Sequence, residues 1–368
     1  MKFLVVGGVA GGASTATRLR RLDESAEIIM FEKGPHVSFS NCCLPYRLSE
    51  TVPETDALVM MSPAQFKNQY NIEARVEHEV LSINRDEKTV RVKNLTTGEE
   101  YTESYDKLIL SPGANAFVPQ LPGIENANIF IVKNVVDIAK LYDFVHSGNV
   151  KKVTVVGGGF IGVETAENLV EAGYAVTLVE AMPQILRIFD YDMVQILHKE
   201  MMEKGVNLIL NDQVVSCEGS NLKLASGAVV EGDAVVMAIG VRADSKLAKE
   251  AGLELNERGA IKVDANYCTS DRDIYAVGDA IEVYNALTHR PVSLTMAGPA
   301  QKQARAAADH IYGRTVRNTG YIGSSCIRVF DYNAAAAGLT AAQCEAAGIS
   351  YDIAYVIPQD KVGLMPNN

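Results

Sequence analysis

Residues 152–180 read KVTVVGGGFIGVETAENLVEAGYAVTLVE, and this stretch decides the fold. An apolar run, a glycine-rich turn, a helical segment and a second apolar run ending in Glu180 form the pattern of a βαβ unit in a parallel sheet. Residues 2–32 follow the same plan, with KFLVVGG, then AGGASTATRLRRL, then EIIMFE. Two such units predict an α/β fold with two Rossmann-like, three-layer domains, each binding a nucleotide.

The bulk composition limits the classes of function. A chain of 368 residues should divide into two or three domains. The net charge of −11 argues against nonspecific binding of nucleic acid. No apolar run reaches the roughly 18 residues that a membrane span needs. The six cysteines lack metal-type spacing, so we expect no metal site and free thiols in a reducing cytoplasm.

The second glycine turn carries the stronger nucleotide signal. Gly157 allows a tight turn, Gly159 lets a pyrophosphate approach the backbone, and Gly162 lets helix and strand pack closely. Glu180 ends the next strand, where a carboxylate accepts ribose hydroxyls, and no Arg follows it to hold a 2′-phosphate. NADH is therefore preferred over NADPH. The residues assigned to this site are Gly157, Gly159, Phe160, Ile161, Gly162, Glu164, Glu180 and Gly240. For Glu164 two readings stay open, a contact with the nicotinamide or a solvent-facing position.

The first turn is less regular, because Val9 stands where the middle glycine is expected. A second motif supports it: residues 274–280 read IYAVGDA, a strand–Gly–Asp pattern in which Asp279 would meet the ribitol of FAD. The helix that begins AGPAQ either directs its N-terminus at the flavin or is simply a helix start. The residues assigned to FAD are Gly7, Val9, Gly11, Gly12, Glu32, Lys33, Gly113, Asp279, Ala297 and Pro299.

These motifs divide the chain into three parts. Residues 1–115 and 245–320 are predicted to form a discontinuous FAD-binding domain, and residues 116–244 an NAD-binding domain. Residues 321–368 read as the opening of a third domain whose remainder is absent from the sequence. The ending VGLMPNN offers no strand partner or helix to close a core.

Residues 38–46, SFSNCCLPY, contain the candidate reactive thiol. Pro45 suits the first turn of a helix, which would place Cys42 or Cys43 near its N-terminus and lower the pKa of the thiol. The alternative is a small buried apolar residue, which is the usual fate of a free cysteine. A disulfide between these two neighbours would be strained.

The motifs GGVAGG, SFSNCCLPY, YDKLILSPGA, GGGFIGVE, AIGVRAD and IYAVGDA occur in an order that resembles the pyridine nucleotide-disulfide oxidoreductases. The resemblance covers nearly the whole chain. It is to the single-cysteine branch of CoA-disulfide reductases, NADH oxidases and NADH peroxidases, and it is nearest to the CoA-disulfide reductases. It implies that Cys42 is the redox cysteine, with Asn41 and Ser38 in the catalytic site. Cys43 fills a place usually held by Gly or Ala, which makes it a bystander.

Two further implications come from the same resemblance. Ala10 stands where the related oxidases and peroxidases carry a His that stabilises a cysteine sulfenate, so disulfide chemistry is favoured over peroxide chemistry. Arg18 and Arg21 share a helix face and would grip the phosphates of CoA. A solvated charged face is the alternative for these two arginines.

The resulting functional hypothesis is an FAD-dependent NADH oxidoreductase that reduces CoA disulfide, or CoA persulfide or polysulfide, through Cys42. CoA would be bound covalently at Cys42 during the cycle. Two alternatives stay open. One is an NADH oxidase or peroxidase that cycles Cys42 through a sulfenic acid, and the other is a flavin redox sensor or electron-transfer protein without turnover. The resemblance also implies a homodimer for the full-length protein, formed by the third domain.

Overall fold

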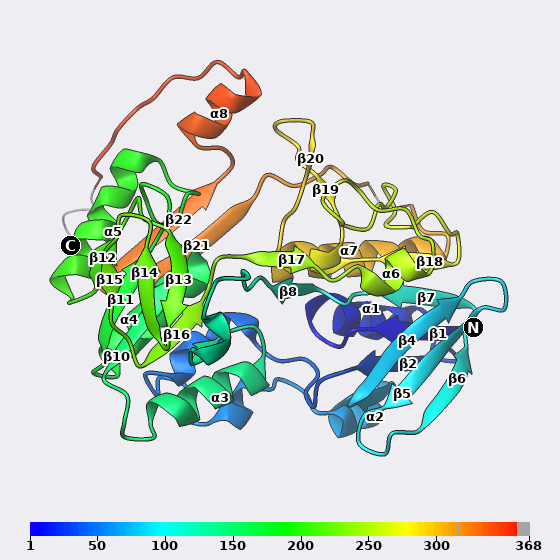
Figure 1. Cartoon of the computed structure of the whole chain (residues 1–368). Coiled ribbons are helices and arrows are strands. Elements are labelled where there is room, and N and C mark those ends of the chain that lie inside the picture. Colours follow the sequence, from blue (N-terminus) through cyan, green and yellow to red (C-terminus); the bar gives the residue numbers. More distant parts are fainter. Residues whose placement is uncertain (316, 359–368) are drawn as a thin grey trace, which may run out of the picture.

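The computed structural model describes residues 1–315 and 317–358. Two five-stranded parallel sheets lie in separate lobes, one on the right and one on the left of Figure 1. In both sheets the central strand is flanked by the strand that follows its helix and by a later strand, and the two sheets differ in the origin of one edge strand. The predicted fold class, two Rossmann-like units in an α/β chain, is confirmed.

The first sheet has the order β18-β7-β1-β2-β3. Its strands are β1 (Lys2–Val6), β2 (Glu27–Glu32), β3 (Glu73–Val76), β7 (Lys107–Leu110) and β18 (Ile274–Ala276). Helices α1 (Ala10–Leu22) and α7 (Ala297–Ile311) pack against each other beside this sheet. The antiparallel strands β4 (His78–Asn84), β5 (Thr89–Asn94) and β6 (Glu100–Ser104) form a further layer. Turns at residues 85–88 and 95–97 connect these strands.

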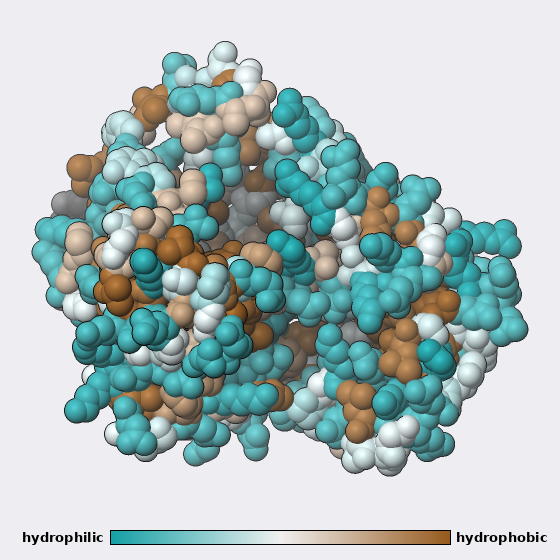
Figure 2. Space-filling view, in the orientation of Figure 1, coloured by the Kyte–Doolittle hydropathy of each residue, from teal (hydrophilic) through white to brown (hydrophobic). Residues whose placement is uncertain are grey.

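The second sheet has the order β12-β11-β10-β16-β9. Its strands are β9 (Ile129–Phe130), β10 (Lys152–Val156), β11 (Ala175–Val179), β12 (Asn207–Ile209) and β16 (Ala234–Met237). The helices of this lobe are α3 (Val135–Val145), α4 (Phe160–Glu171) and α5 (Tyr191–Glu203). The strands β13 (Val214–Glu218), β14 (Asn221–Leu224) and β15 (Val229–Val230) form a small antiparallel sheet. Hydrophobic side chains gather over β13–β15 on an otherwise largely hydrophilic face (Figure 2), and Val215 and Val229 are exposed there.

Short elements complete the chain. The two lobes are linked by β8 (Ala114–Ala116) and β17 (Val241–Ala243), which pair in antiparallel fashion. The remaining α-helices and strands are α2 (Pro63–Tyr70), α6 (Lys246–Glu250), β19 (Val283–Tyr284), β20 (Pro291–Val292), β21 (Ser324–Val329), β22 (Tyr332–Ala337) and α8 (Ala341–Ala347). The single-turn 3-10 helices are η1 (Asn41–Cys43), η2 (Pro45–Arg47), η3 (Thr55–Leu58), η4 (Ile124–Asn126) and η5 (Gly278–Ala280). No helix in the described part of the chain is long and apolar enough to cross a membrane.

Each lobe has its own hydrophobic core. One contains Phe3, Met30 and Ile109 from the first sheet, and the other contains Val155, Leu178 and Val236 from the second. The hairpin β21–β22 joins the second core through Ile327 and Val329. Residues 362–368, VGLMPNN, for which we expected no strand partner and no helix, lie outside the described residues.

Candidate active site between two nucleotide-binding turns

The turn between β10 and α4 has the space and the donors that a pyrophosphate needs. A Cβ built on Gly159 would meet no atom within 4 Å, so the backbone here is open. Gly159 is also the N-cap of α4, no side chain caps this helix, and its first turn holds no acidic residue. The unpaired N–H groups and the helix dipole therefore favour an anion. By contrast, a Cβ on Gly162 would lie 1.9 Å from the carbonyl oxygen of Gly157, so Gly162 serves close packing.

Glu180 lies beside this turn. Its Oε2 accepts a hydrogen bond from the backbone N–H of Gly158 at 2.6 Å, and its Oε1 accepts one from Met182 at 2.8 Å. Phe160 and Ile161 begin α4, and Gly240 follows β16 with φ +113°. The residues assigned to the NAD site are thus brought together at the carboxyl ends of β10, β11 and β16, where parallel sheets of this topology bind ligands.

The first turn is built more tightly. Gly7 has φ +95°, and a Cβ there would lie 2.0 Å from the carbonyl oxygen of Ser111 at the end of β7. A Cβ on Gly12 would lie 1.8 Å from the carbonyl oxygen of Gly7. Gly11 also contacts Ser111, because its Cβ would lie 2.4 Å from the hydroxyl. Gly11 therefore packs the helix against β7, and Val9 takes the N-cap place that Gly159 has in the other unit.

Glu32 repeats the arrangement of Glu180. Its carboxylate accepts from the N–H groups of Gly8 and Gly34, both at 2.9 Å. The side chain of Lys33 is paired with Asp244, with its Nζ 3.3 Å from that carboxylate, and it is largely exposed. Gly113 has φ +74° and a Cβ there would meet nothing within 4 Å.

Asp279 lies in η5 at the carboxyl end of β18. The pKa of the Asp279 carboxyl is raised above its ordinary value, mainly by burial. Lys133, whose Nζ lies 3.7 Å away, acts in the opposite direction and lowers this pKa. Ala297 and Pro299 lie in the first turn of α7, which has no capping side chain and no acidic residue there. A half-buried acid and an uncapped helix N-terminus can meet a polar ligand, so these residues fit FAD.

The cysteine segment differs from the prediction. Instead of one α-helix with Cys42 at its N-terminus, residues 41–47 form two single 3-10 turns, η1 and η2. The predicted lowering of the thiol pKa is wrong, because the pKa of Cys42 is raised, first by burial and then by the charge of Glu164. Short 3-10 turns supply little dipole to offset these effects. Cys42 and Cys43 are free thiols, so the structure contains no disulfide between them.

The segment before Cys42 is held by both lobes. The backbone N–H of Ser38, which has φ +49°, donates to the carbonyl of Gly8 in the first glycine turn at 2.8 Å. Asn41 Nδ2 donates to the carbonyl of Lys133 at 3.0 Å, and the side chain of Lys133 reaches Asp279. The thiol is therefore positioned at the junction of the two nucleotide-binding units.

Glu164 lies on α4 close to this junction and does not face open solvent. Burial, together with the neighbouring Glu167, raises its pKa to about 7. Its charge acts on the thiol of Cys42 and on the phenol of Tyr46. A carboxyl with this pKa can hold or release a proton near neutral pH.

Three comparisons with known proteins agree with this geometry. The family model described as pyridine nucleotide-disulphide oxidoreductase matches residues 1–304. The coenzyme A disulfide reductase of Staphylococcus aureus strain JH9 is 35% identical over 339 residues, which are 92% of this chain and 77% of that protein. Reduced CoADR-RHD of Bacillus anthracis has a TM-score of 0.94 at 44% identity, covering 95% of this chain and 64% of that one. The NAD-dependent persulfide reductase of A. fulgidus has a TM-score of 0.91 at 33% identity, covering 95% and 66%.

The chain belongs to the pyridine nucleotide-disulphide oxidoreductase family. The resemblance inferred from the motifs is thereby confirmed. Enzymes of this family use FAD and NAD(P)H, and the class of enzyme is a flavoprotein disulphide reductase. The chain spans about two thirds of the length of the two solved structures that it matches.

The two arginines assigned to CoA do not lie free on one face of this oxidoreductase. Arg18 is bonded to Asp309 of α7, with its Nη2 2.6 Å from the carboxylate. Arg21 is exposed, and its guanidinium lies 5.8 Å from the ring centre of Tyr70. An anion at Arg18 would have to compete with Asp309, so the CoA assignment of this pair stays a prediction.

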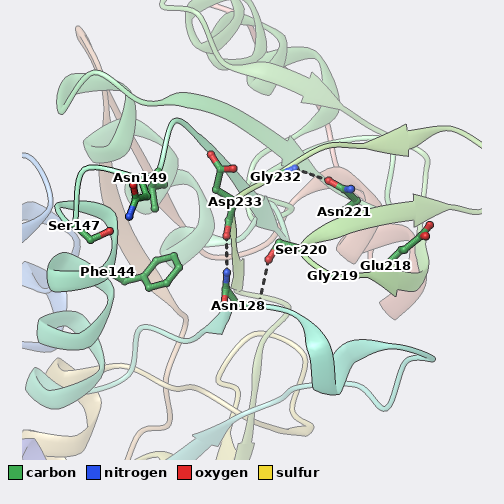
Figure 3. Close-up of a pocket in the computed structure, with 11 residues that line it drawn as sticks. Asn128, Phe144, Ser147, Asn149, Glu218, Gly219, Ser220, Asn221, Gly232 and Asp233 are labelled. Carbon is green, nitrogen blue, oxygen red and sulfur yellow. Dashed lines mark hydrogen bonds between the residues drawn. The ribbon is translucent and has the colours of Figure 1, made fainter.

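A hollow lies at the amino-terminal ends of the strands of the second sheet (Figure 3). It has a volume of about 450 Å³ and is lined by residues before β9, β10 and β16, including Asn128, Asn149 and Asp233. These are the amino ends of parallel strands, whereas the glycine turns follow the carboxyl ends. Asn128 is bonded to the carbonyl of Asp233 and to Ser220. This hollow is therefore separate from the nucleotide sites.

Sequence reasoning missed three groups near Cys42. Lys133 was not assigned, although it contacts Asn41 and Asp279. Cys326 lies in β21, and the structure brings its thiol near enough to raise the pKa of Cys42. The pKa of the Tyr46 phenol is raised, first by burial and then by the charges of Glu164 and Glu167, while Arg328 acts in the opposite direction. No local motif reveals Lys133 and Cys326, because they come from segments far from Cys42 in the sequence, whereas Tyr46 ends the motif SFSNCCLPY itself. Among the described residues, no group of three His, Cys, Asp or Glu side chains could hold a metal ion.

Proposed function

We propose that this protein reduces CoA disulfide, or a CoA persulfide or polysulfide, with electrons from NADH, through the single redox cysteine Cys42. The observation that carries the proposal is the position of Cys42, whose segment is bonded to the first glycine turn through Ser38 and to the second lobe through Asn41. The relatives named as CoA disulfide reductase and persulfide reductase support this class of substrate.

The residues that would hold the two cofactors follow from the glycine turns. We assign the NADH site to the open turn at Gly159 and to Glu180, and the FAD site to Glu32, Asp279 and the first turn of α7. When bound, NADH and FAD supply the hydride and the electron relay. The chain Glu180-Ala181-Met182 offers no cation for a 2′-phosphate, which favours NADH over NADPH.

The thiol chemistry can be written with a single cysteine. The Cys42 thiolate attacks one sulfur of CoA disulfide, forms a mixed disulfide with CoA, and releases the first CoA thiolate. Two electrons then cleave the mixed disulfide and return the Cys42 thiolate and a second CoA. Glu164, with a pKa of about 7, can hold a proton close to the thiol near neutral pH. Arg18 and Arg21 are our candidates for the CoA phosphates, and Cys43 is assigned no role.

The domain boundaries, assembly and compartment belong to the same proposal. We divide the chain into residues 1–115 with 245–320, 116–244, and 321–368, because β8 and β17 pass between the two sheets near residues 115 and 244. We expect a homodimer for the full-length protein. Six free thiols fit a reducing compartment such as the cytoplasm.

A steady-state assay with different acceptors tests the function. NADH consumption would be measured with CoA disulfide, CoA persulfide, hydrogen peroxide or oxygen, using the FAD-loaded protein. We expect turnover with the CoA species, loss of it in Cys42→Ser, and retention in the matched variant Cys43→Ser. Mass spectrometry should find CoA attached to the peptide that holds Cys42. Turnover of peroxide or oxygen but of no CoA species would instead favour the oxidase or peroxidase alternative.

A further inference from the structure

The segment that follows Cys42 packs in the core of the second lobe, although the sequence places it with the first. Leu44, Leu48 and Leu58 are at most 1% exposed and belong to the same hydrophobic cluster as Leu141 of α3 and Leu169 of α4. In Figure 1 this blue segment lies among the green helices of the left lobe. The cysteine segment is therefore attached to the nicotinamide-binding unit by its buried side chains.

A cation–π contact adds to this attachment. The guanidinium of Arg47, at the end of η2, lies 3.4 Å from the ring centre of Tyr142 on α3. Arg47 is only 6% exposed, and its Nε donates to the hydroxyl of Thr55 at 3.3 Å. The hydroxyl of Tyr142 donates to Glu50 at 2.5 Å. Arg47 and Glu50, both in the segment after Cys42, therefore contact the same aromatic residue of α3. Such a contact gains strength when it is desolvated.

A hydrogen bond ties the same segment to α4. The hydroxyl of Ser49 donates to Oδ1 of Asn168 at 2.6 Å, and Asn168 is completely buried. Nδ2 of Asn168 donates in turn to the backbone carbonyl of Glu164 at 2.8 Å. Ser49 is thereby connected to the turn of α4 that carries Glu164.

We propose that Arg47 and Ser49 are positioning residues that fasten the Cys42 segment to α3 and α4, and so hold the Cys42 thiol beside Glu164. Single 3-10 turns have too few internal hydrogen bonds to fix their own position, so η1 and η2 depend on such contacts. The importance of this position for catalysis rests on the proposed function, in which Cys42 is the reacting thiol. The position itself follows from the contacts with α3 and α4 and does not depend on the proposed function.

Loosening the segment has a defined chemical consequence. The thiol of Cys42 is held at a raised pKa by burial and by Glu164, with smaller effects of Cys43 and Cys326. Further charged or titratable groups at this junction are Tyr46, Glu167 and Arg328, and on the side of Asn41 the pair Lys133 and Asp279. Cys42 is already exposed, so a segment that shifts away from α4 changes its thiol mainly by moving it away from the charge of Glu164. Its thiol should therefore ionise at lower pH and react faster near neutrality.

The test measures how fast iodoacetamide alkylates Cys42 between about pH 6 and about pH 10 in the FAD-loaded full chain, with the modified peptide quantified by mass spectrometry. In Ser49→Ala we expect the midpoint of the profile to fall by about half a pH unit, and the rate at pH 7 to rise roughly threefold. Ser49→Thr keeps the hydroxyl and should restore the wild-type profile. Thr51→Val is the matched control, because Thr51 is exposed and contacts Ser49 but not α4.

Arg47→Met provides the second variant, since it removes the cation from the ring of Tyr142. We expect a shift in the same direction that is at least as large. If Arg47→Met fails to fold, as judged by its melting curve, Ser49→Ala decides alone. A wild-type profile in Ser49→Ala, with an unchanged melting temperature, would overturn the proposal. A failure of the proposed function looks different, because Cys42→Ser would then still turn over CoA disulfide while the alkylation profile still shifted in Ser49→Ala.

Discussion

The replacement Glu164→Gln should change the pH dependence of stability in a predictable direction. In the folded protein the pKa of Glu164 rises from 4.5 to about 7, because the carboxyl is buried and Glu167 lies close by. The folded state therefore holds this proton more tightly than the unfolded state does. The stabilisation that results is complete below about pH 4.5 and is lost as the pH rises through about 7.

The size of the effect follows from the same shift. Each pKa unit corresponds to about 1.4 kcal/mol, so ionising Glu164 costs the folded state on the order of 3 kcal/mol above neutral pH. We take about 2 kcal/mol as the working expectation, because the burial is partial and Glu167 can adjust its own protonation. A glutamine cannot ionise and escapes this cost. The difference in unfolding free energy between Glu164→Gln and the wild type should therefore shift by about 2 kcal/mol in favour of the variant as the pH rises from about 5 to about 8.

Urea denaturation at the two pH values measures this gain. Circular dichroism is the suitable probe, because the chain contains no tryptophan. The matched control is Glu203→Gln on α5, which removes an exposed carboxylate and should show no such pH dependence. The reasoning is refuted if the difference in unfolding free energy between wild type and Glu164→Gln is the same at both pH values.

The remaining predictions concern the cofactor sites. Gly159→Ala should keep the stability within about 0.5 kcal/mol but weaken NADH binding at least tenfold, because its Cβ enters empty space that a pyrophosphate needs; calorimetric titration measures this. Gly162→Ala should instead lower the stability by roughly 2 kcal/mol or more in urea denaturation, since its Cβ meets a backbone oxygen at 1.9 Å. Asp279→Ala should reduce the FAD retained on purification, read from flavin absorbance; full retention would contradict the assignment. Glu180→Gln should lower the preference for NADH over NADPH, measured as the ratio of the two kcat/KM values.

Much of the fold could be predicted because its signals are local. The two βαβ units lie where apolar runs and glycine placement indicated them, and helix α7 begins at Ala297, where the segment AGPAQ indicated a helix start. Glycines at Gly7 and Gly157 have positive φ values that other residues rarely adopt, so the sequence must place glycine there. Both turns are therefore readable without any tertiary contact.

The surroundings of the candidate site were harder to predict from the sequence. The motif around Cys42 suggested a helix and a lowered thiol pKa, but the segment forms short 3-10 turns and the pKa is raised. Arg18 was expected to share a free face with Arg21, yet it is bonded to Asp309, 291 positions away. Pairings of this length leave no periodic signal, because each partner satisfies its own local pattern.

The sequence by itself determined the two nucleotide-binding units, their glycine turns, and a free cysteine directly after Asn41. Only the tertiary structure decided what surrounds that cysteine. Leu44 and Leu48 bury themselves in the second lobe, and this packing places the thiol beside Glu164 rather than at the end of a helix dipole. The physical reason is that a thiol's ionisation depends on burial and nearby charge, which arise from contacts between distant segments.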